Sequence, residues 1–550
     1  MRLKWIGPLP RTVTRPASLL ILLAWAGVMA VLVEGAFVGA SRNLATDLAR
    51  YGSSAQWRGV YYRGEKIGFT VGQTVSMPDG FELREDGQLL MTLLGAHTEA
   101  TLHTTVRVDD AFVLRSFEFA LDPGTGPIAV RGGVEGDDSG RPWQLSLTVT
   151  TGATSRTETR ELEEAPVLAL SLPRRLASGG LTPGARHRWM VFDPATLRNA
   201  PMTATVGRRE IVRDGNGSIP AFRVDMDFAG LQTTSWVTDT GEVVREESPL
   251  GLITIRESEE RARALAVSGQ VRADLLEAAA VVPDTKARID DARDVRRLRV
   301  RLEGADLSGS EVEGAGQHVE GDVVEIVDFD TLGPGPADPE AVRYLAPEPL
   351  IESDDPEILA QVDLALKHTT GARARAEELV RYVNALLEKK PTVSIPSARE
   401  VLRTRIGDCN EHTALYVAMA RAAGIPSRIS VGLAFARGAF YYHAWPEVYL
   451  TDGARGGFWL PVDPTFNQFP ADSTHLRLAR GGLDRQVAIL PLIGRLKMTV
   501  LDLELAPGAT PILVGADAAA AGLPLLPAPR RSTPPPAGGC WLSRLCEGRR

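Results

Sequence analysis

The sequence predicts an α+β protein in which a large antiparallel β region precedes a smaller region of mixed helices and strands. Apolar and polar residues alternate along 57–260, which is typical of strands with one buried and one wet face. Apolar residues recur at helical spacing in 355–367 and 371–389, so two helices are expected there. A third feature, an apolar run at 17–40, predicts a helix that crosses a membrane.

The composition narrows the class of protein. The chain has 550 residues, and domains usually contain about 100–200 residues, so two or three domains are expected. The 44% of hydrophobic and 24% of charged residues are those of a globular protein. The net charge is −8 and the basic residues are scattered, so nucleic acid is not an expected partner. Three cysteines are too few for a disulfide framework.

The N-terminus predicts export. The basic residues of segment 1–16 precede the apolar run, and a positive flank stays on the cytoplasmic side while the following chain is translocated. About 20 residues span a bilayer, which the run supplies. Because Val38, Gly39 and Ala40 resemble a signal-peptidase site, a cleaved signal peptide and a retained signal anchor both fit. We favour the retained anchor.

The expected layout has seven parts. Turn signals such as Pro123-Gly124 divide the strands of the β region, which we interpret as one or two antiparallel modules. The tail is rich in Pro and Ala and is expected to be disordered. In chain order the parts are a basic flank (1–16), a signal anchor (17–40), a polar linker (41–56), the β region (57–260), a connecting region with a short β module (261–345), a mixed domain (346–500) and the tail (501–550).

The mixed domain contains a cysteine at a predicted helix start. Asp408 and Glu411 have the spacing of a capping box, and Gly424 is placed to end the helix. Cys409 therefore lies in the first helical turn. The unpaired amides and the positive end of the helix dipole favour a thiolate there, so we expect Cys409 to be an acidic nucleophile.

Three strands are expected after this helix, at 428–436, 440–450 and 457–463. If they pair as neighbours against the helix, His443 can reach the thiol and Asp463 can reach the far imidazole nitrogen. That arrangement supplies a base for the thiol proton and a carboxylate that fixes the tautomer of the base.

Simpler explanations exist for these residues. A free cysteine is often only a small buried apolar residue, but the order of Cys409, His443 and Asp463 favours chemistry. His412 lies one turn after the cysteine, and we expect a structural role or substrate contact for it. Zinc is not expected, because the spacing of the Cys and His residues is unlike that of zinc sites. Whether Cys540 and Cys546 pair stays open.

The motifs resemble the transglutaminase-like superfamily, above all its exported bacterial members. The matching blocks are Gly-Asp-Cys-Asn-Glu-His at 407–412, Gly-Ile-Pro-Ser-Arg at 424–428, His-Ala-Trp-Pro-Glu-Val-Tyr at 443–449 and Val-Asp-Pro-Thr at 462–465. The likeness covers about 355–480. It implies a papain-like core in which a helix packs on an antiparallel sheet. It also implies a triad of Cys409 (nucleophile), His443 (base) and Asp463 (orienting acid). No cofactor is expected, and calcium dependence is not carried over.

The resemblance implies an exported, membrane-anchored thiol enzyme that cleaves peptide or side-chain amide bonds through a thioester. We favour hydrolysis over transfer to an amine. The expected partners are a protein or peptide substrate and the bacterial inner membrane. Trp445 and Gln468 are the candidate substrate contacts; the alternatives are a core or cleft-wall aromatic for Trp445 and a surface loop residue for Gln468. The bulk would lie on the periplasmic side, or be secreted if the leader is cleaved. The alternative is a catalytically silent envelope assembly protein whose β region binds the partner. The oligomeric state stays open.

Overall fold

The computed structural model describes residues 55–509 and 512–513, with short gaps. The gaps are at 94–95, 123–126, 137–141, 153, 215–216, 229, 249–250, 265–273, 286, 305–306, 308–311, 392–396, 452–455, 482–488 and 490–491. The predicted membrane helix at 17–40 and most of the predicted tail lie outside the described residues. Within the described part of the chain, no helix is long and apolar enough to cross a membrane.

The β region folds as one antiparallel sheet, which contains 14 strands within the described residues. The strand order is β8-β7-β6-β5-β4-β3-β2-β1-β14-β13-β12-β11-β10-β9, so the two halves meet where β1 pairs with β14. The strands are β1 Gln56–Tyr62, β2 Glu65–Met77, β3 Gly80–Leu93, β4 Ala96–Val108, β5 Leu114–Asp122, β6 Ile128–Glu135, β7 Trp143–Thr151, β8 Thr154–Leu162, β9 Arg186–Asp193, β10 Arg198–Asp214, β11 Gly217–Phe228, β12 Leu231–Val237, β13 Val243–Glu247 and β14 Leu252–Glu257.

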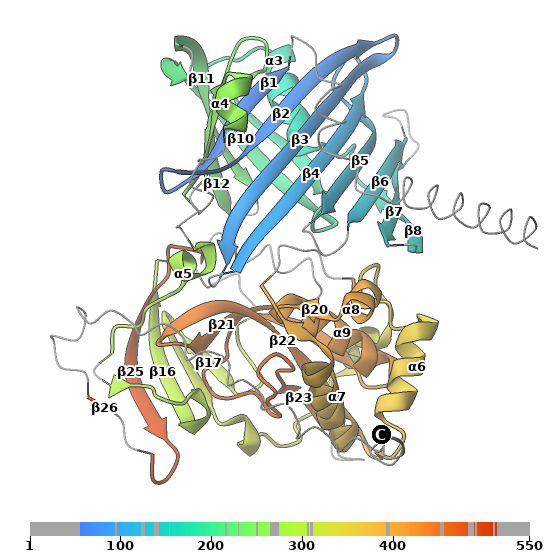
Figure 1. Ribbon diagram of the computed structural model, residues 1–550, viewed down its shortest axis with the longest axis vertical. Coiled ribbons are helices and arrows are strands. Elements are labelled where there is room, and N and C mark those ends of the chain that lie inside the picture. The colour runs from blue at the N-terminus through green and yellow to red at the C-terminus, as the bar shows by residue number, and fades with distance from the viewer. Residues whose placement is uncertain are drawn as a thin grey trace, which may run out of the picture.

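This sheet is curved, and short helices cover both of its sides (Figure 1). On the inner side, α3 (Leu172–Ser178) packs against β9 to β12 through Leu172 and Leu176, and η1 (Ala169–Ser171) contacts β3, β4 and β9. On the outer side, α4 (Glu259–Arg263) covers Trp57 and Phe69. β7, for example, alternates buried and more exposed residues as predicted, because a strand presents successive side chains to opposite faces.

The described residues of the second half contain helices, two four-stranded sheets and the two-stranded sheets β15-β26 and β19-β20. The strand orders of the two four-stranded sheets are β17-β18-β16-β25 and β23-β22-β21-β24. The strands are β15 Ala287–Arg288, β16 Val295–Glu303, β17 Gln317–Glu320, β18 Val323–Val327, β19 Glu388–Lys389, β20 Ile406–Gly407, β21 Ser427–Ala436, β22 Ala439–Thr451, β23 Gly457–Pro461, β24 Leu476–Gly481, β25 Lys497–Leu505 and β26 Ile512–Leu513. The helices are α5 Leu275–Ala279, η2 Ala292–Asp294, η3 Phe329–Thr331, η4 Pro339–Leu345, α6 Pro356–Ala365, α7 Ala372–Leu386, α8 Ala398–Thr404 and α9 Cys409–Ala422.

The core of this half is formed around α9. Its residues Ala414 to Ala420 are fully buried between the helices α6 to α8 and the strands β21 and β22. Figure 1 shows α7 and α9 beside β22. The protein is therefore mostly antiparallel sheet with some helices, which agrees with the predicted α+β class. The packing of α9 on an antiparallel sheet also agrees with the core expected from the sequence, in which a helix packs on such a sheet.

The β region is one continuous sheet, which is one of the two alternatives left open by the sequence, because β1 pairs with β14 from the far end of the region. Two elements differ from the sequence analysis. The predicted tail starts too early, since β25 extends to Leu505 and pairs with β16. β24 was not predicted, and it completes the sheet beside β21. All three features depend on pairing between segments far apart in the chain, which local patterns do not encode.

Candidate active site

The start of α9 is fixed by the neighbours of Cys409, its first residue. Asp408 Oδ1 accepts a hydrogen bond from the backbone N–H of Asn410 (2.9 Å), and Glu411 Oε2 accepts one from the backbone N–H of Asp408 (2.8 Å). The predicted capping box is therefore confirmed. A side chain at Gly407 would collide with it, because a Cβ there would lie 2.2 Å from the Glu411 Cβ.

Cys409 is half-buried, and its sulfur lies against β22. At this contact Thr413 Oγ1 donates to the carbonyl of Ala444 (3.0 Å), and the backbone of Ala444 hydrogen-bonds to the sulfur. Burial, together with the carboxylates of Asp408 and Glu411, raises the pKa of the thiol well above its usual value, and the Ala444 hydrogen bond offsets this only in part. The expectation of an acidic thiol is corrected: the same residues that cap the helix place two negative charges beside it.

This environment predicts how Cys409 reacts with an alkylating agent. A thiol with a raised pKa is mostly protonated at pH 7, and its thiolate fraction rises about tenfold per pH unit below that pKa. The carboxymethylation rate of the Cys409 peptide, followed by mass spectrometry, should therefore rise continuously from pH 6 to pH 9. N-acetylcysteine serves as the reference thiol. A rate that is already constant below pH 7 would contradict the prediction and indicate a preformed thiolate–imidazolium pair.

His443 lies in β22, and Asp463 follows β23. The Nε2 atom of His443 is 2.7 Å from Asp463 Oδ2, while Asp463 Oδ1 accepts the backbone N–H groups of Thr465 (2.6 Å) and Phe466 (3.0 Å). The ring of Phe466 stacks on the imidazole, with centroids 4.7 Å apart and planes 5° from parallel. Backbone amides thus fix the position of the Asp463 carboxylate, which in turn hydrogen-bonds to His443 Nε2. The other ring nitrogen, Nδ1, is then the one that can accept a proton from a thiol.

Residues 360–464 match the sequence profile of the transglutaminase-like superfamily. This part of the chain is similar to that superfamily. The matched stretch includes Cys409, His443 and Asp463. The transglutaminase-like part is a minor share of the chain. A comparison of the whole chain with curated proteins found no match.

Solved structures resemble parts of the chain at low sequence identity. A candidate cysteine protease from Cytophaga hutchinsonii is 16% identical, and the likeness covers 40% of this chain and 91% of that protein, with a TM-score of 0.27. A beta-barrel-like protein of a domain of unknown function from Brucella abortus is 12% identical over 37% of this chain and 96% of its own, with a TM-score of 0.29. The periplasmic domain of TgpA from Pseudomonas aeruginosa, bound to ethylmercury, is 18% identical over 32% and 92%, with a TM-score of 0.21.

The structure adds a second histidine beside the transglutaminase-like residues. His475 Nε2 lies 3.0 Å from Asp463 Oδ2, the oxygen that also contacts His443, and His475 Nδ1 lies 3.2 Å from Asp472 Oδ1. Burial lowers the pKa of His475, but the two carboxylates outweigh it and raise that pKa to about 10. His475 is therefore an imidazolium between two carboxylates. It immediately precedes β24, outside the matched residues, and no local pattern pointed to it.

Asp463 stays ionised at this position although it is fully buried. Burial raises the pKa of its carboxyl group, but the charge of His443 and the hydrogen bonds of His443 and His475 hold that pKa well below its usual range. An ionised carboxylate stabilises the positive charge that a base acquires when it takes a proton. The electrostatic arrangement is therefore suited to His443 acting as a general base.

The two residues predicted to contact substrate are buried in the transglutaminase-like part. Trp445 is 1% exposed, and its ring packs beside those of His443 and His475. Gln468 is hydrogen-bonded to Asp472 through both ends of its amide. These contacts make both residues supports of the site, and their contact with a substrate stays a prediction.

His412 is enclosed on α9. Its Nδ1 atom lies 2.7 Å from the carbonyl of Asp408, and burial lowers the pKa of its ring. No described residue provides a hydrogen-bond partner for its Nε2 atom. The side chain of His412 is fully buried. Of the two roles expected from the sequence, structural support and substrate contact, burial agrees with the structural one.

The ligand atoms of His443, Asp463 and His475 lie within 4.8 Å of one another, which is close enough to consider a metal ion. A metal needs neutral imidazoles with one nitrogen directed at it. Here Asp463 Oδ2 occupies the Nε2 atoms of both histidines, and Asp472 holds the other nitrogen of His475. The raised pKa of His475 also keeps that ring protonated. The donor set fits a hydrogen-bonded charge network rather than a cation site.

Proposed function

We propose that this chain is a thiol enzyme that attacks the carbonyl carbon of an amide, with Cys409 as nucleophile, His443 as base and Asp463 as the orienting acid. One observation carries the proposal. The imidazole whose Nε2 is bound by Asp463 lies next to Ala444, the residue whose backbone hydrogen-bonds to the Cys409 sulfur. A nucleophile, a base and an orienting carboxylate in this order are the requirements of triad chemistry.

The raised pKa of the thiol determines how the first step proceeds. Because Cys409 is protonated at rest, His443 Nδ1 takes the S–H proton as the sulfur–carbon bond forms, and the carbonyl electrons move onto the oxygen. The backbone N–H of Cys409 lies at the start of α9, where intrahelical partners are lacking, and is a donor for that oxyanion. The tetrahedral adduct then expels the amine, which takes the proton from His443, and leaves a thioester.

The second step decides the type of enzyme. With water, His443 removes a proton from the attacking water, the thioester C–S bond breaks, and a carboxylic acid and the free thiol are released. With a lysine amine, a new amide would form instead. We favour water, so the proposed class is a peptidase or amidase that acts on a protein or peptide.

An isotope experiment tests this choice. The full chain is incubated with a peptide library and dansylcadaverine in H₂¹⁸O, and products are analysed by mass spectrometry. Hydrolysis is expected to place one ¹⁸O atom in each new carboxyl group, and side-chain and backbone cleavage are separated by product mass. Dansyl-labelled products without ¹⁸O would reverse the assignment to amine transfer. Neither product from any peptide would reject the proposed activity.

We also propose that the chain is anchored in the bacterial inner membrane by the apolar run at 17–40, with the remaining chain in the periplasm. The basic flank before this run is the support for the orientation. Protease treatment of spheroplasts should degrade the β region while an N-terminal tag stays protected. Degradation only after cell lysis would contradict this orientation.

A further inference from the structure

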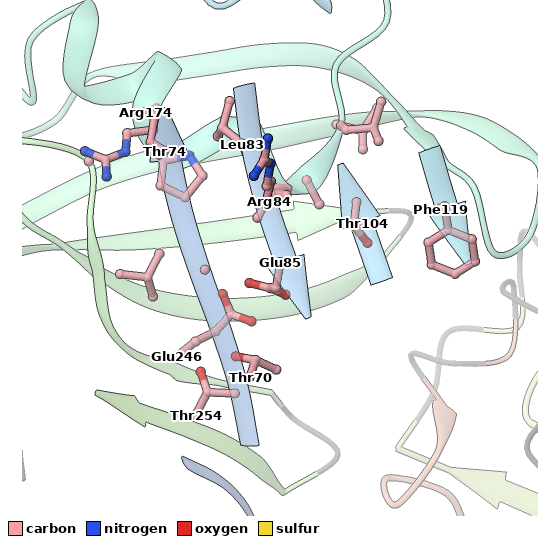
Figure 2. A pocket seen from close by; sticks show the side chains of 18 of the residues that line it. Thr70, Thr74, Leu83, Arg84, Glu85, Thr104, Phe119, Arg174, Glu246 and Thr254 are labelled. Carbon is pink, nitrogen blue, oxygen red and sulfur yellow. The ribbon is translucent and has the colours of Figure 1, made fainter. Parts of the chain in front are cut away.

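A cavity of about 510 Å³ lies on the inner side of the curved 14-stranded sheet of the described β region. It is lined by strands from both halves of the sheet together with η1 and α3, and none of the proposed catalytic residues takes part. Figure 2 shows the lining residues projecting from β2 to β5 and from the strands opposite. Its volume falls in the range of sites for small organic molecules.

One wall of this cavity is apolar. Leu83 and Phe119 point inward from β3 and β5, and Leu170 of η1 and Phe228 of β11 add to the same lining. Leu83 and Phe119 are almost fully buried, so they are part of the inner core of the sheet as well as of the cavity. Burying an apolar chain against this wall is favourable in free energy, because apolar surface is removed from water.

The other wall is polar. Most of the charged groups described on it already have an ion-pair or hydrogen-bond partner. Arg58 forms an ion pair with Glu85, and its buried Nε atom has no partner among the described residues. Glu246 accepts a hydrogen bond from Ser235 (2.8 Å). Thus the carboxylates of this wall already have donors.

Arg174 of α3 is the exception in this cavity. Its guanidinium donates to the carbonyl of Thr240, and it forms no ion pair with a carboxylate among the described residues. It is half-buried, and burial lowers its pKa, while the charge of Glu242 offsets this only in part. The backbone of α3 at Arg174 approaches Gly241 closely. A Cβ added to Gly241 would lie 2.7 Å from the Arg174 Cα, so a glycine is needed at position 241.

We propose that this cavity binds a single-chain amphiphile with an anionic head group. The apolar chain lies along the wall of Leu83 and Phe119, and the anion lies against Arg174. A carboxylate or phosphate supplies a counter-charge at ion-pair distance and accepts charge-assisted hydrogen bonds from the guanidinium. Glu246 faces the same cavity and would repel an anion placed at its own end, so the head group is directed to Arg174.

Photochemical labelling tests the site in the full chain. Dodecanoate with a diazirine near its methyl end is irradiated with the protein, and labelled peptides are identified by mass spectrometry. Label is expected on the peptides that contain Leu83 or Phe119. Unlabelled dodecanoate should compete more strongly than dodecanol, and dodecyltrimethylammonium should compete least. Label confined to other peptides, or strongest competition by the cation, would overturn the proposal.

The matched variants are neighbours on α3. Arg174→Gln should weaken competition by dodecanoate about tenfold, the loss expected for one charge-assisted hydrogen bond, and leave dodecanol unchanged. Arg174→Lys should restore part of the loss. Arg175→Gln is the control, since Arg175 lies over the Trp189 ring and outside the cavity lining. Equal competition in wild type and Arg174→Gln, both with the same circular dichroism spectrum, would refute the assigned head-group position. Because no catalytic residue is altered, these outcomes are independent of the proposed activity.

Discussion

Cys409→Ala is expected to lower the turnover of any amide substrate found in the isotope experiment by about 10⁴-fold or more. Removing the nucleophile of a triad leaves only binding and oxyanion stabilisation, and losses of this size or larger are typical. The substitution removes a single sulfur atom from a half-buried position, so the fold should be retained. The measurement is the rate of ¹⁸O incorporation at saturating peptide, with the unfolding midpoint as a check on folding.

The matched control for this prediction is Cys540→Ala, which removes a thiol from the same chain outside the superfamily match. It should keep the activity of the wild type. If Cys409→Ala retained activity within tenfold of the wild type, the thioester mechanism would be rejected. Full function of Cys409→Ala in cells, lost on deletion of 57–260, would instead support the silent binding protein.

Asp463→Asn is expected to lower turnover by about 10⁴-fold while leaving the shape of the site intact. The amide cannot hold the imidazole of His443 in the required tautomer, nor stabilise its positive charge after proton transfer. The readout is kcat for the selected peptide across pH 6 to 9. A loss below tenfold would show that the carboxylate has no orienting role.

The same substitution should also destabilise the fold. His475 is a buried imidazolium, and Asp463 is one of its two carboxylate partners, so removing the charge should cost about 3–5 kcal/mol in the free energy of unfolding at pH 7. In the wild type the depressed pKa of Asp463 contributes stability above its unfolded pKa of about 4, and this is lost as pH falls. The stability difference between wild type and variant should therefore shrink below pH 4. Asp110→Asn, at an exposed position, is the control.

The pKa of His475 is shifted upward, opposite to that of Asp463. This upward shift sets the alkaline limit of the stabilisation that the charge network provides. Its folded pKa of about 10 lies above the ordinary histidine value of about 6.5, so its contribution to stability is complete below pH 6.5 and is lost as pH rises toward 10. Urea titrations of the wild type between pH 5 and 10 measure this alkaline limit. A stability difference that does not change with pH would count against the buried charge network.

Local chemistry was sufficient to predict the helix start at Cys409. The capping box joins residues three positions apart, so the order of Asp408 and Glu411 determines it whatever surrounds the helix. The same holds for α6 and α7, whose apolar spacing gave their positions, and for the alternation of the large sheet. The order of Cys409, His443 and Asp463 was also readable from the sequence.

Tertiary structure decided how these groups interact. The helix dipole alone would make Cys409 acidic, but burial and two neighbouring carboxylates outweigh it, because charges interact strongly where water is excluded. The contact of His475 with Asp463 depends on the turn that leads into β24, and the cavity depends on pairing β1 with β14. The sequence by itself determined the local elements and the reactive groups. The distances, burial and charges that set their chemistry arise only when distant segments pack together, since no short stretch of chain contains both partners.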